Sequence, residues 1–413
     1  MTTKSHSTPD LSDRSAQSIP DTTKQGGHAS PNSQDSQQLD ASSPKPRTLT
    51  VTRWTDWSVA APLVPAWQSL CRLDSHATVF ASHGFVRALW RSFGDDAPLE
   101  LLAVCDGDDT IGLVPFTQRT MRRAGLAYRE VGFYRNHHTL RNSVLAAPGK
   151  HGLVLSAILE AMARTAGWHV MFLENIPSQS PIATELGPAA SRQGLRNDPV
   201  EPGRRLCFAA INGTWAEYRA AMSRNQRWQL KKSQRRAHEL GRVEYRCLST
   251  RAEIADALPE VFLLQAKSWQ EIERTDPTVT AADHAFEYAL LDDLDDDEIG
   301  DLWLMTIDGR LVASLRMLGA PRKRYVHTMH YDPAAKEVSP GSLLFEKMLE
   351  AAWAAGLMEV DFHGDGAFFR RWTSQHREHV TTRVYSASML GMLLQSGRRL
   401  RHQWRAAMAR NAD

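Results

Sequence analysis

The segment DFHGDGAFFRRW, residues 361–372, carries three side chains that can move a proton. Asp361, His363 and Asp365 come at the end of a short apolar run, and the glycines beside them permit a tight turn. Transfer of an acyl group to an amine needs a base that removes a proton from the nucleophile. We therefore predict that this segment supplies the general base. The alternative is a turn in which Asp361 only caps local N–H groups.

The segment RYVHTMHY, residues 324–331, alternates as a β-strand does. Strict alternation places four side chains on one face: Tyr325, His327, Met329 and Tyr331. We predict that one face lines the acyl or acceptor pocket, with His327 as a further candidate base and Tyr331 as a substrate contact. Arg316, on the preceding strand, either holds an anionic acceptor or points to water. The alternative for His327 is a core or rim position, which is common for a lone histidine in a strand.

The segment SPGSLLFEKML, residues 339–349, leads from a loop directly into an amphipathic helix. Free backbone N–H groups and the helix dipole make such an N-terminus attractive to anions. Glycine lets the backbone approach a ligand closely, and a serine hydroxyl can donate or cap. We predict that Ser339, Gly341, Ser342 and Leu343 bind an anionic cofactor. A simple capped helix is the alternative.

The segment SRNQRWQLKKSQRR, residues 223–236, has six basic side chains and no acid. At about 100° per residue, the basic residues gather along one side of a helix. The opposite side is expected to dock through Gln226, Leu230, Ser233, Ala237 and Leu240. We predict that one or two of Arg224, Arg227 and Lys231 bind a phosphorylated ligand or an anionic acceptor, and a solvated face is the alternative. Six cations could also contact nucleic-acid phosphates, but a net charge of +2 for the whole chain argues against that partner.

Three further segments or residue types bear on which ligands and metals the protein could bind. The segment RNHHTLRN, residues 135–142, could bind the acceptor through His137 and His138 with the flanking Arg135 and Arg141, or it could form a solvated loop. We expect no metal there, because adjacent histidines would point apart on a strand. The acidic run LDDLDDDEIGD, residues 291–301, lacks the spacing of an EF-hand and is expected to be a charged connector.

The four cysteines form no CxxC pair, which excludes a standard zinc site and suits a reducing, cytoplasmic compartment.

Composition separates the two ends of the chain from its middle. Residues 1–48 contain no aromatic residue and are expected to be a disordered tail without a secretory signal. No stretch approaches the roughly 20 apolar residues of a membrane-spanning helix. The C-terminal segment 386–413 joins an apolar run to a basic run, which predicts a helix that docks on the domain or, alternatively, touches an anionic membrane surface.

Between these ends the predicted elements follow one order twice. A β-hairpin, a third strand, a helix and a further strand are expected in residues 49–205 and again in residues 206–385. The sequence thus predicts an α/β (α+β) protein made of two tandem halves. Each half is expected to have a mixed, mostly antiparallel sheet flanked by helices.

Five segments in this order resemble the GNAT acyltransferases, over about residues 55–385. They are FASHGFVRALWRSF, SRNQRWQLKKSQRRAHELG, DGRLVASLRML, SPGSLLFEKMLEAA and VDFHGDGAFFRRW. The resemblance is to the tandem branch that holds FemAB-type peptidoglycan aminoacyltransferases and CelD-like acetyltransferases. It implies an acyl-CoA whose pantetheine arm lies between two diverging strands and whose pyrophosphate sits on the following helix. Because SPGS replaces the usual Q/R-x-x-G-x-G/A loop and no long helical-hairpin insertion is present, the CelD-like side is favoured.

The leading hypothesis is an acyl-CoA-dependent N-acyltransferase whose acceptor is an amine on a small molecule or glycan precursor, with no metal. The second is a FemAB-like aminoacyltransferase that uses aminoacyl-tRNA. The third is a non-catalytic module that binds a polysaccharide precursor or a partner protein. Binding of a CoA thioester distinguishes the first hypothesis from the other two.

Overall fold

The computed structural model describes residues 49–57, 60–94, 98–123, 125–268 and 277–410. The predicted disordered tail, residues 1–48, lies outside these residues. The described chain falls within one compact unit, Arg47–Asp413. None of its described helices combines the length and apolar character that crossing a bilayer requires.

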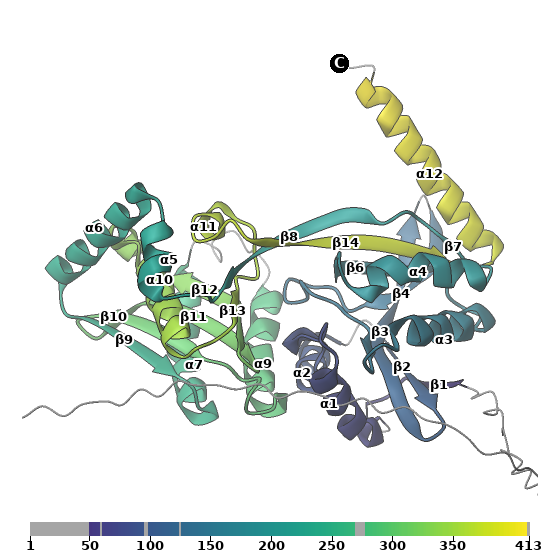
Figure 1. Ribbon diagram of the computed structural model, residues 1–413, viewed down its shortest axis with the longest axis horizontal. Helices are drawn as coiled ribbons and strands as arrows, with labels where there is room; N and C mark the ends of the chain where they lie inside the picture. Colours follow the sequence, from purple (N-terminus) through teal and green to yellow (C-terminus); the bar gives the residue numbers. More distant parts are fainter. Residues whose placement is uncertain (1–48, 58–59, 95–97, 124, 269–276, 411–413) are drawn as a thin grey trace, which may run out of the picture. The chain divides into compact units, whose positions relative to one another are not determined.

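The predicted order of elements is confirmed in both halves (Figure 1). The first half contains α1 (Val64–Leu73), α2 (His83–Phe93), the hairpin β2 (Leu99–Asp106) and β3 (Asp109–Arg123), β4 (Leu126–Phe133), α3 (His151–Arg164) and β6 (Val170–Pro177). The second half contains the hairpin β10 (Leu302–Ile307) and β11 (Arg310–Ala320), β12 (Lys323–Tyr331), α10 (Pro340–Ala354) and β13 (Glu359–Asp361). In each half the strand after the helix pairs in parallel with the strand before it, β6 with β4 and β13 with β12. The α/β fold class is therefore confirmed.

Several elements escaped the sequence analysis. They are β1 (Leu49–Trp54), α1, α4 (Pro181–Arg192), the short strands β5 (Leu145–Ala146) and β7 (Arg196–Asn197), β8 (Glu201–Ala210), α9 (Pro277–Asp293), α11 (Ala367–Arg370) and β14 (His376–Tyr385). The exposed part of β8 contains a proline, a glycine and two arginines, and β14 begins with four charged or titratable residues, so neither strand has a clear apolar signal. The segment 291–301, predicted to be a connector, begins inside α9, whose last residue is Asp293.

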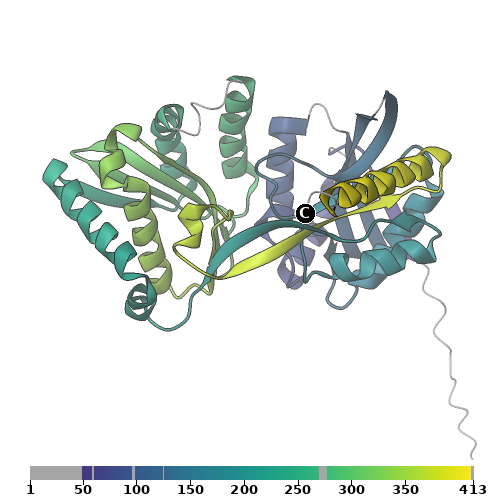
Figure 2. The same ribbon diagram turned by 90° about the horizontal axis from the view of Figure 1, so that it is seen from above.

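Two long strands join the halves into one sheet. The strand order is β1-β2-β3-β4-β6-β14-β8-β13-β12-β11-β10-β9, where β9 spans Val243–Leu248. The first part of β8 pairs with β14, and its last three residues pair with β13. The C-terminal strand β14 thus completes the first half, between β6 and β8 (Figure 2). The predicted boundary at residue 205 falls inside β8.

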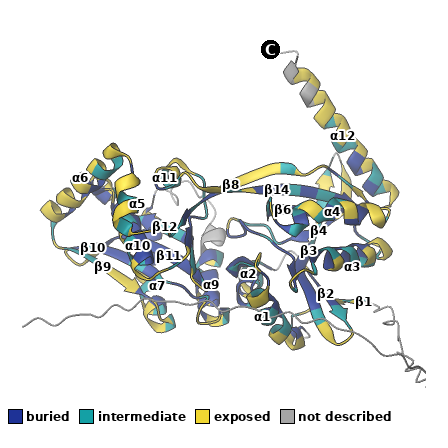
Figure 3. Ribbon diagram, viewed as in Figure 1, coloured by how far each residue is buried: buried dark blue, intermediate teal, exposed yellow. Residues whose placement is uncertain are grey.

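Helices cover both faces of the second half's sheet (Figure 3). On one face α10 packs with α5 (Trp215–Ala221) and α6 (Arg224–Leu240), around a core that includes Phe345 and Phe362. On the other face α7 (Arg251–Lys267) and α9 pack together with α2 of the first half, around Phe286 and Phe85. A helix of the first half therefore helps to close one side of the second half.

The local sequence explains where these helices begin. Thr214 and Glu217 form a capping box at α5, and Thr250 and Glu253 form another at α7. Each box satisfies N–H groups that a helix start leaves unpaired. Ser223 caps α6 by accepting a hydrogen bond from the backbone N–H of Gln226.

Candidate functional site

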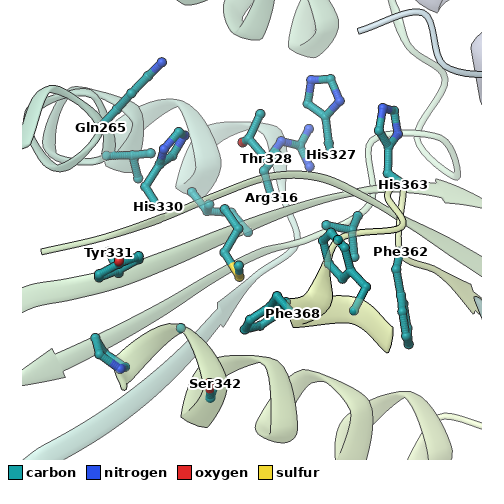
Figure 4. Close-up of a pocket in the computed structure, with 18 of the residues that line it drawn as sticks. Gln265, Arg316, His327, Thr328, His330, Tyr331, Ser342, Phe362, His363 and Phe368 are labelled. Carbon is teal, nitrogen blue, oxygen red and sulfur yellow. The ribbon is translucent and has the colours of Figure 1, made fainter. Parts of the chain in front are cut away.

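The strands β12 and β13 separate soon after they begin to pair. Their parallel pairing covers Lys323–Tyr325 against Glu359–Asp361, and from there to Tyr331 this edge of β12 has no strand partner among the residues that the structure describes. A cavity of about 880 Å³ opens beside this unpaired stretch of β12 (Figure 4). One wall of the cavity comes from the N-terminus of α10, and the other comes from α7 and α9. Backbone groups at the free edge of β12 are available to pair with an extended ligand.

A β-bulge at His327 corrects the predicted alternation of β12. Arg316 pairs with Thr328 while Met317 pairs with Val326, so His327 has no partner on β11. An extra residue shifts the following side chains to the other face. Met329 and Tyr331 consequently pack on the α10 side, whereas Tyr325 packs on the α9 side with His327. The prediction that Tyr325, His327, Met329 and Tyr331 share one face is therefore wrong.

His327 lies in a buried polar cluster on the α9 side of the cavity. Its Nε2 is 3.4 Å from Glu287 Oε1, and its ring stacks on His138 with the centroids 5.0 Å apart. Burial lowers the pKa of His327 well below its ordinary value, and the positive charge that neighbouring histidines and Arg316 can carry adds to the shift. The imidazole is therefore neutral near pH 7 and able to accept a proton.

Arg316 is buried, which removes the alternative that it points to water. Its Nη1 donates to the carbonyl oxygen of Ile299 at 2.7 Å, and its Nε is 3.4 Å from Glu287 Oε2. Burial raises the pKa of Glu287, and the neighbouring Arg316 opposes that shift. Arg316 lines the cavity, but its side chain chiefly contacts Glu287 and the backbone carbonyl of Ile299.

His137 and His138 lie together, not apart as expected. They occupy a turn after β4, and their Nε2 atoms approach Asp283 Oδ1 at 3.0 and 3.1 Å. All three ligand atoms lie within 4.8 Å of one another, a spacing that a divalent cation could use. The same spacing suits two hydrogen bonds to one carboxylate oxygen, and we assign no metal here. The histidines lower the pKa of Asp283, against the effect of its burial.

His363 reaches the cavity from the loop after β13, where its backbone adopts a left-handed φ of 57°. Its Nδ1 lies 3.3 Å from Arg141 Nη1. An arginine can only donate, so Nδ1 accepts and the proton of the neutral ring sits on Nε2. Burial lowers the pKa of His363 well below its ordinary value, and Arg141 lowers it further. His363 therefore offers an N–H donor to the cavity.

The α10 wall carries the predicted anion site. Ser339, Gly341 and Ser342 line the cavity, whereas Leu343 faces the hydrophobic core. Ser339 adopts a left-handed conformation and Pro340 occupies the first turn, where its missing N–H costs nothing. Two cations adjoin this wall: Lys336 lines the cavity, and Arg371 Nη2 donates to Ser342 Oγ at 3.1 Å.

A second cavity, of about 830 Å³, adjoins the first at the start of α10. Both are lined by Ser339, Ser342 and Arg371. The second cavity is also lined by uncharged residues of α6: Asn225, Gln226, Gln229, Leu230 and Ser233. The basic face of α6 lies elsewhere, because Arg224, Arg227 and Lys231 line neither cavity. Their role in ligand binding stays a prediction.

The docking side predicted for α6 is largely confirmed. Leu230, Ser233 and Ala237 are buried, but Leu240 is 60% exposed. Leu240 is the last residue of the helix and extends beyond the residues that α6 packs against. Trp228 lies in the basic arc as expected, with Lys232 Nζ 4.8 Å from its ring centre.

Asp361 and Asp365 belong to ion pairs and do not line the cavity. Asp361 is buried, accepts hydrogen bonds from Arg141 and from the backbone N–H of His363, and lies 3.4 Å from Arg377. Burial raises the pKa of Asp361, while Arg141 and Arg377 oppose the shift. Asp365 pairs with Arg370 at 2.9 Å, which lowers its pKa. These contacts favour structural roles over the base predicted from sequence.

We expect Asp361→Ala to lower the free energy of unfolding by about 3–5 kcal/mol, because it leaves a buried guanidinium without its partner. Arg141 has only 3% of its side chain exposed, so water cannot replace the lost carboxylate. Asp365→Ala is the matched control, since its partner Arg370 is 59% exposed and such pairs contribute about 0–1 kcal/mol. Urea unfolding measures both variants, and equal costs would contradict the structural role of Asp361.

Four charged residues of the cavity were not predicted from the sequence. Asp283 and Glu287 lie one helical turn apart on the same face of α9, a helix that was not predicted either. Lys336 lies in a short 3₁₀ helix, Pro333–Val338, before α10. Arg371 lies in the segment 361–372 and had no predicted role. An i, i+4 pair of acids beside apolar positions was the available signal for the first two.

Comparisons with known proteins give a match to one family model and similarity in fold to solved structures. Residues 224–372 match a family model described as an acetyltransferase (GNAT) domain. No curated protein matches the sequence. Among solved structures, FemX is similar with a TM-score of 0.54 and 11% identity, covering 76% of this chain and 95% of its own. A conserved protein of unknown function from Bacteroides thetaiotaomicron has a TM-score of 0.51 and 10% identity, covering 81% of this chain and 100% of its own. At these identities the solved structures show a shared fold.

Proposed function

We propose that this protein, which contains a GNAT acetyltransferase domain over residues 224–372, is an acyl-CoA-dependent N-acyltransferase. Its reaction would transfer an acyl group to an amine on a small molecule or glycan precursor. The observation that carries the proposal is the unpaired edge of β12 facing the N-terminus of α10, with Arg371 and Lys336 beside that terminus. A strand edge can pair with an amide-bearing chain, and the helix terminus with its cations can hold phosphates.

Two connected cavities suit a long, two-part donor. The pantetheine arm would lie along β12 from Val326 to Tyr331, and the pyrophosphate would meet Gly341, Ser342 and Arg371. The nucleotide would extend into the second cavity, against the uncharged face of α6. In this placement the nucleotide contacts the uncharged, inward side of α6. The basic side chains of α6 lie outside the cavity.

The opposite wall suits an amine acceptor. Asp283 and Glu287 place carboxylates on the α9 side, and the cations Lys336 and Arg371 lie on the α10 side. An acceptor that carries an ammonium group would be attracted to the acidic wall, as the donor phosphates would be to the basic wall. The opposite charges of the two walls would thus direct the acceptor to the α9 side and the donor phosphates to the α10 side.

His327 is the general base that the geometry supports best. Among the described residues neither ring nitrogen makes a hydrogen bond, although Nε2 lies 3.4 Å from Glu287 Oε1, and the ring is neutral near pH 7. His363 already bears its proton on Nε2, so it is suited to donate toward the oxygen of the tetrahedral intermediate. The amine would lose its proton to His327 and attack the thioester carbonyl directly, and the thiol would leave after protonation. None of the four cysteines lines the two cavities, so we infer no covalent acyl-enzyme.

An aminoacyl-tRNA donor is the second candidate. The similarity in fold to FemX, together with the resemblance to FemAB-type enzymes, favours it. The outward cations of α6 would then contact the RNA backbone. A non-catalytic module that binds a precursor would retain the cavity but show no turnover with either donor.

Binding of acetyl-CoA tests the proposal. We expect it to raise the melting temperature, and we expect Arg371→Ala to weaken its affinity about 10- to 100-fold because hydrogen bonds to charged groups contribute about 1.5–3 kcal/mol. Arg246→Ala is the matched control, since Arg246 is exposed on β9 and lines neither cavity. If saturating acetyl-CoA gives no shift while charged tRNA is retained on a filter, the second candidate replaces the first.

A further inference from the structure

The described contacts that hold the C-terminal helix α12 (Met389–Arg410) to the body lie mainly in its first half, and His402 adds one at 3.7 Å from Glu201. Leu394 and Gln395 are buried, and Gln395 Nε2 donates to the carbonyl oxygen of Asn197 at 3.2 Å. Arg398 forms ion pairs with Asp198 at 3.1 Å and Glu201 at 2.6 Å. Beyond these contacts the helix extends away from β14 and β7 (Figure 1). Most of the described side chains in its second half are therefore exposed.

The outward side of α12 is an apolar stripe. Five large apolar side chains there are more than half exposed: Met389, Leu393, Leu400, Trp404 and Met408. At about 100° per residue they fall within roughly one-third of the helix circumference. The buried contacts of α12 lie on the other side. An apolar stripe of this length, left exposed along a helix, indicates a binding face.

The charge of α12 is wholly positive. Its 22 residues include five arginines and no aspartate or glutamate. Arg399 and Arg401 flank the apolar stripe on either side, at about 100° per residue. Arginine carries its charge on a long apolar stem, so it can reach an anionic surface while the stripe is buried.

We propose that α12 lies on the surface of a lipid bilayer that contains anionic lipid, with the apolar stripe in the headgroup region and Arg399 and Arg401 on lipid phosphates. Helices that bind in this way combine an apolar face, a cationic face and aromatic residues at the interface, and Trp404 supplies the aromatic group. Nucleic acid would leave the stripe exposed. A second copy of α12 would bring five arginines against five others. The acyl-transfer cavities are not involved, so the inference stands independently of the proposed donor.

Sedimentation of the full chain with vesicles tests the proposal. We expect binding to vesicles of phosphatidylcholine mixed with phosphatidylglycerol, and weak or no binding to phosphatidylcholine alone. Leu400→Gln combined with Trp404→Gln should reduce the binding at least tenfold. Arg399→Gln combined with Arg401→Gln should reduce it about 10- to 30-fold, since each cation near an anionic surface contributes appreciably.

The control removes two exposed cations from another helix, through Arg235→Gln combined with Arg236→Gln on α6. This variant should bind as the wild type does. Equal loss in the α6 variant, no binding to anionic vesicles, or full binding by the Leu400 and Trp404 variant would each overturn the proposal. Association of the chain with itself through the stripe, without vesicle binding, would overturn it too. An unchanged melting temperature for each variant shows that the fold is intact.

Discussion

Replacing Gly341 with leucine is expected to lower kcat/KM for acyl-CoA by more than about 100-fold, because the new side chain enters the space assigned to the donor. Gly341 lines the cavity in the first turn of α10. A Cβ at this position would meet Met329 Sδ at 3.7 Å and Cε at 3.9 Å, both ordinary contacts. The remaining carbons of leucine would continue past Met329 into the cavity.

Gly341→Ala is the matched control for this prediction. Its single methyl group fits at van der Waals distance, and alanine favours a helix. We expect Gly341→Ala to keep most of the activity and the thermal shift with acetyl-CoA, and Gly341→Leu to keep the fold while losing both. If Gly341→Leu binds acetyl-CoA as the wild type does, the donor lies elsewhere.

His327→Gln is expected to lower kcat by about 10²- to 10⁴-fold, the usual contribution of a positioned general base. Glutamine has a similar size and can still reach Glu287, so the buried cluster should remain folded. His330→Gln is the matched control because His330 is also a buried histidine of β12 that lines the cavity. A steady-state assay of CoA release measures both, and an equal loss in the two variants would contradict the assignment.

The pH profile gives an independent test of the same residue. Burial, together with neighbouring histidines and Arg316, lowers the pKa of His327 well below 6.5. A base is active in its neutral form, so activity should fall only as the pH drops below that lowered pKa. We expect kcat/KM to change little with this group at and above pH 6.5, and the acidic limb to disappear in His327→Gln. An acidic limb near 6.5 or above would indicate an exposed base.

Periodicity and turn residues were enough to predict the repeated hairpin, strand, helix and strand. These elements depend on local apolar patterns, such as the buried run of β11 and the amphipathic α10. The strands β8 and β14 were not predicted, because their amino-acid composition is not typical of strands. They become strands through hydrogen bonds to their neighbours in the sheet. Each pairs with segments that are about 150 or more residues away in the sequence, as β14 does with β6.

The anion site on α10 was predictable because a helix N-terminus and a glycine are local signals. The polar wall on the α9 side was not, since it depends on long-range contacts. The bulge at His327 reverses the alternation that the sequence implies, and only the register with β11 reveals it. The ion pair between Arg141 and Asp361 links residues 220 positions apart, so the sequence could not distinguish a buried structural carboxylate from a base.

A crystal structure of the protein with a non-hydrolysable acyl-CoA analogue tests the central claim most directly. We expect the pantetheine arm beside β12 between Val326 and Tyr331, the pyrophosphate beside Gly341, Ser342 and Arg371, and the carbonyl carbon within reach of His327. An analogue bound outside the two cavities, or none bound at saturating concentration, would contradict an acyl-CoA-dependent transferase.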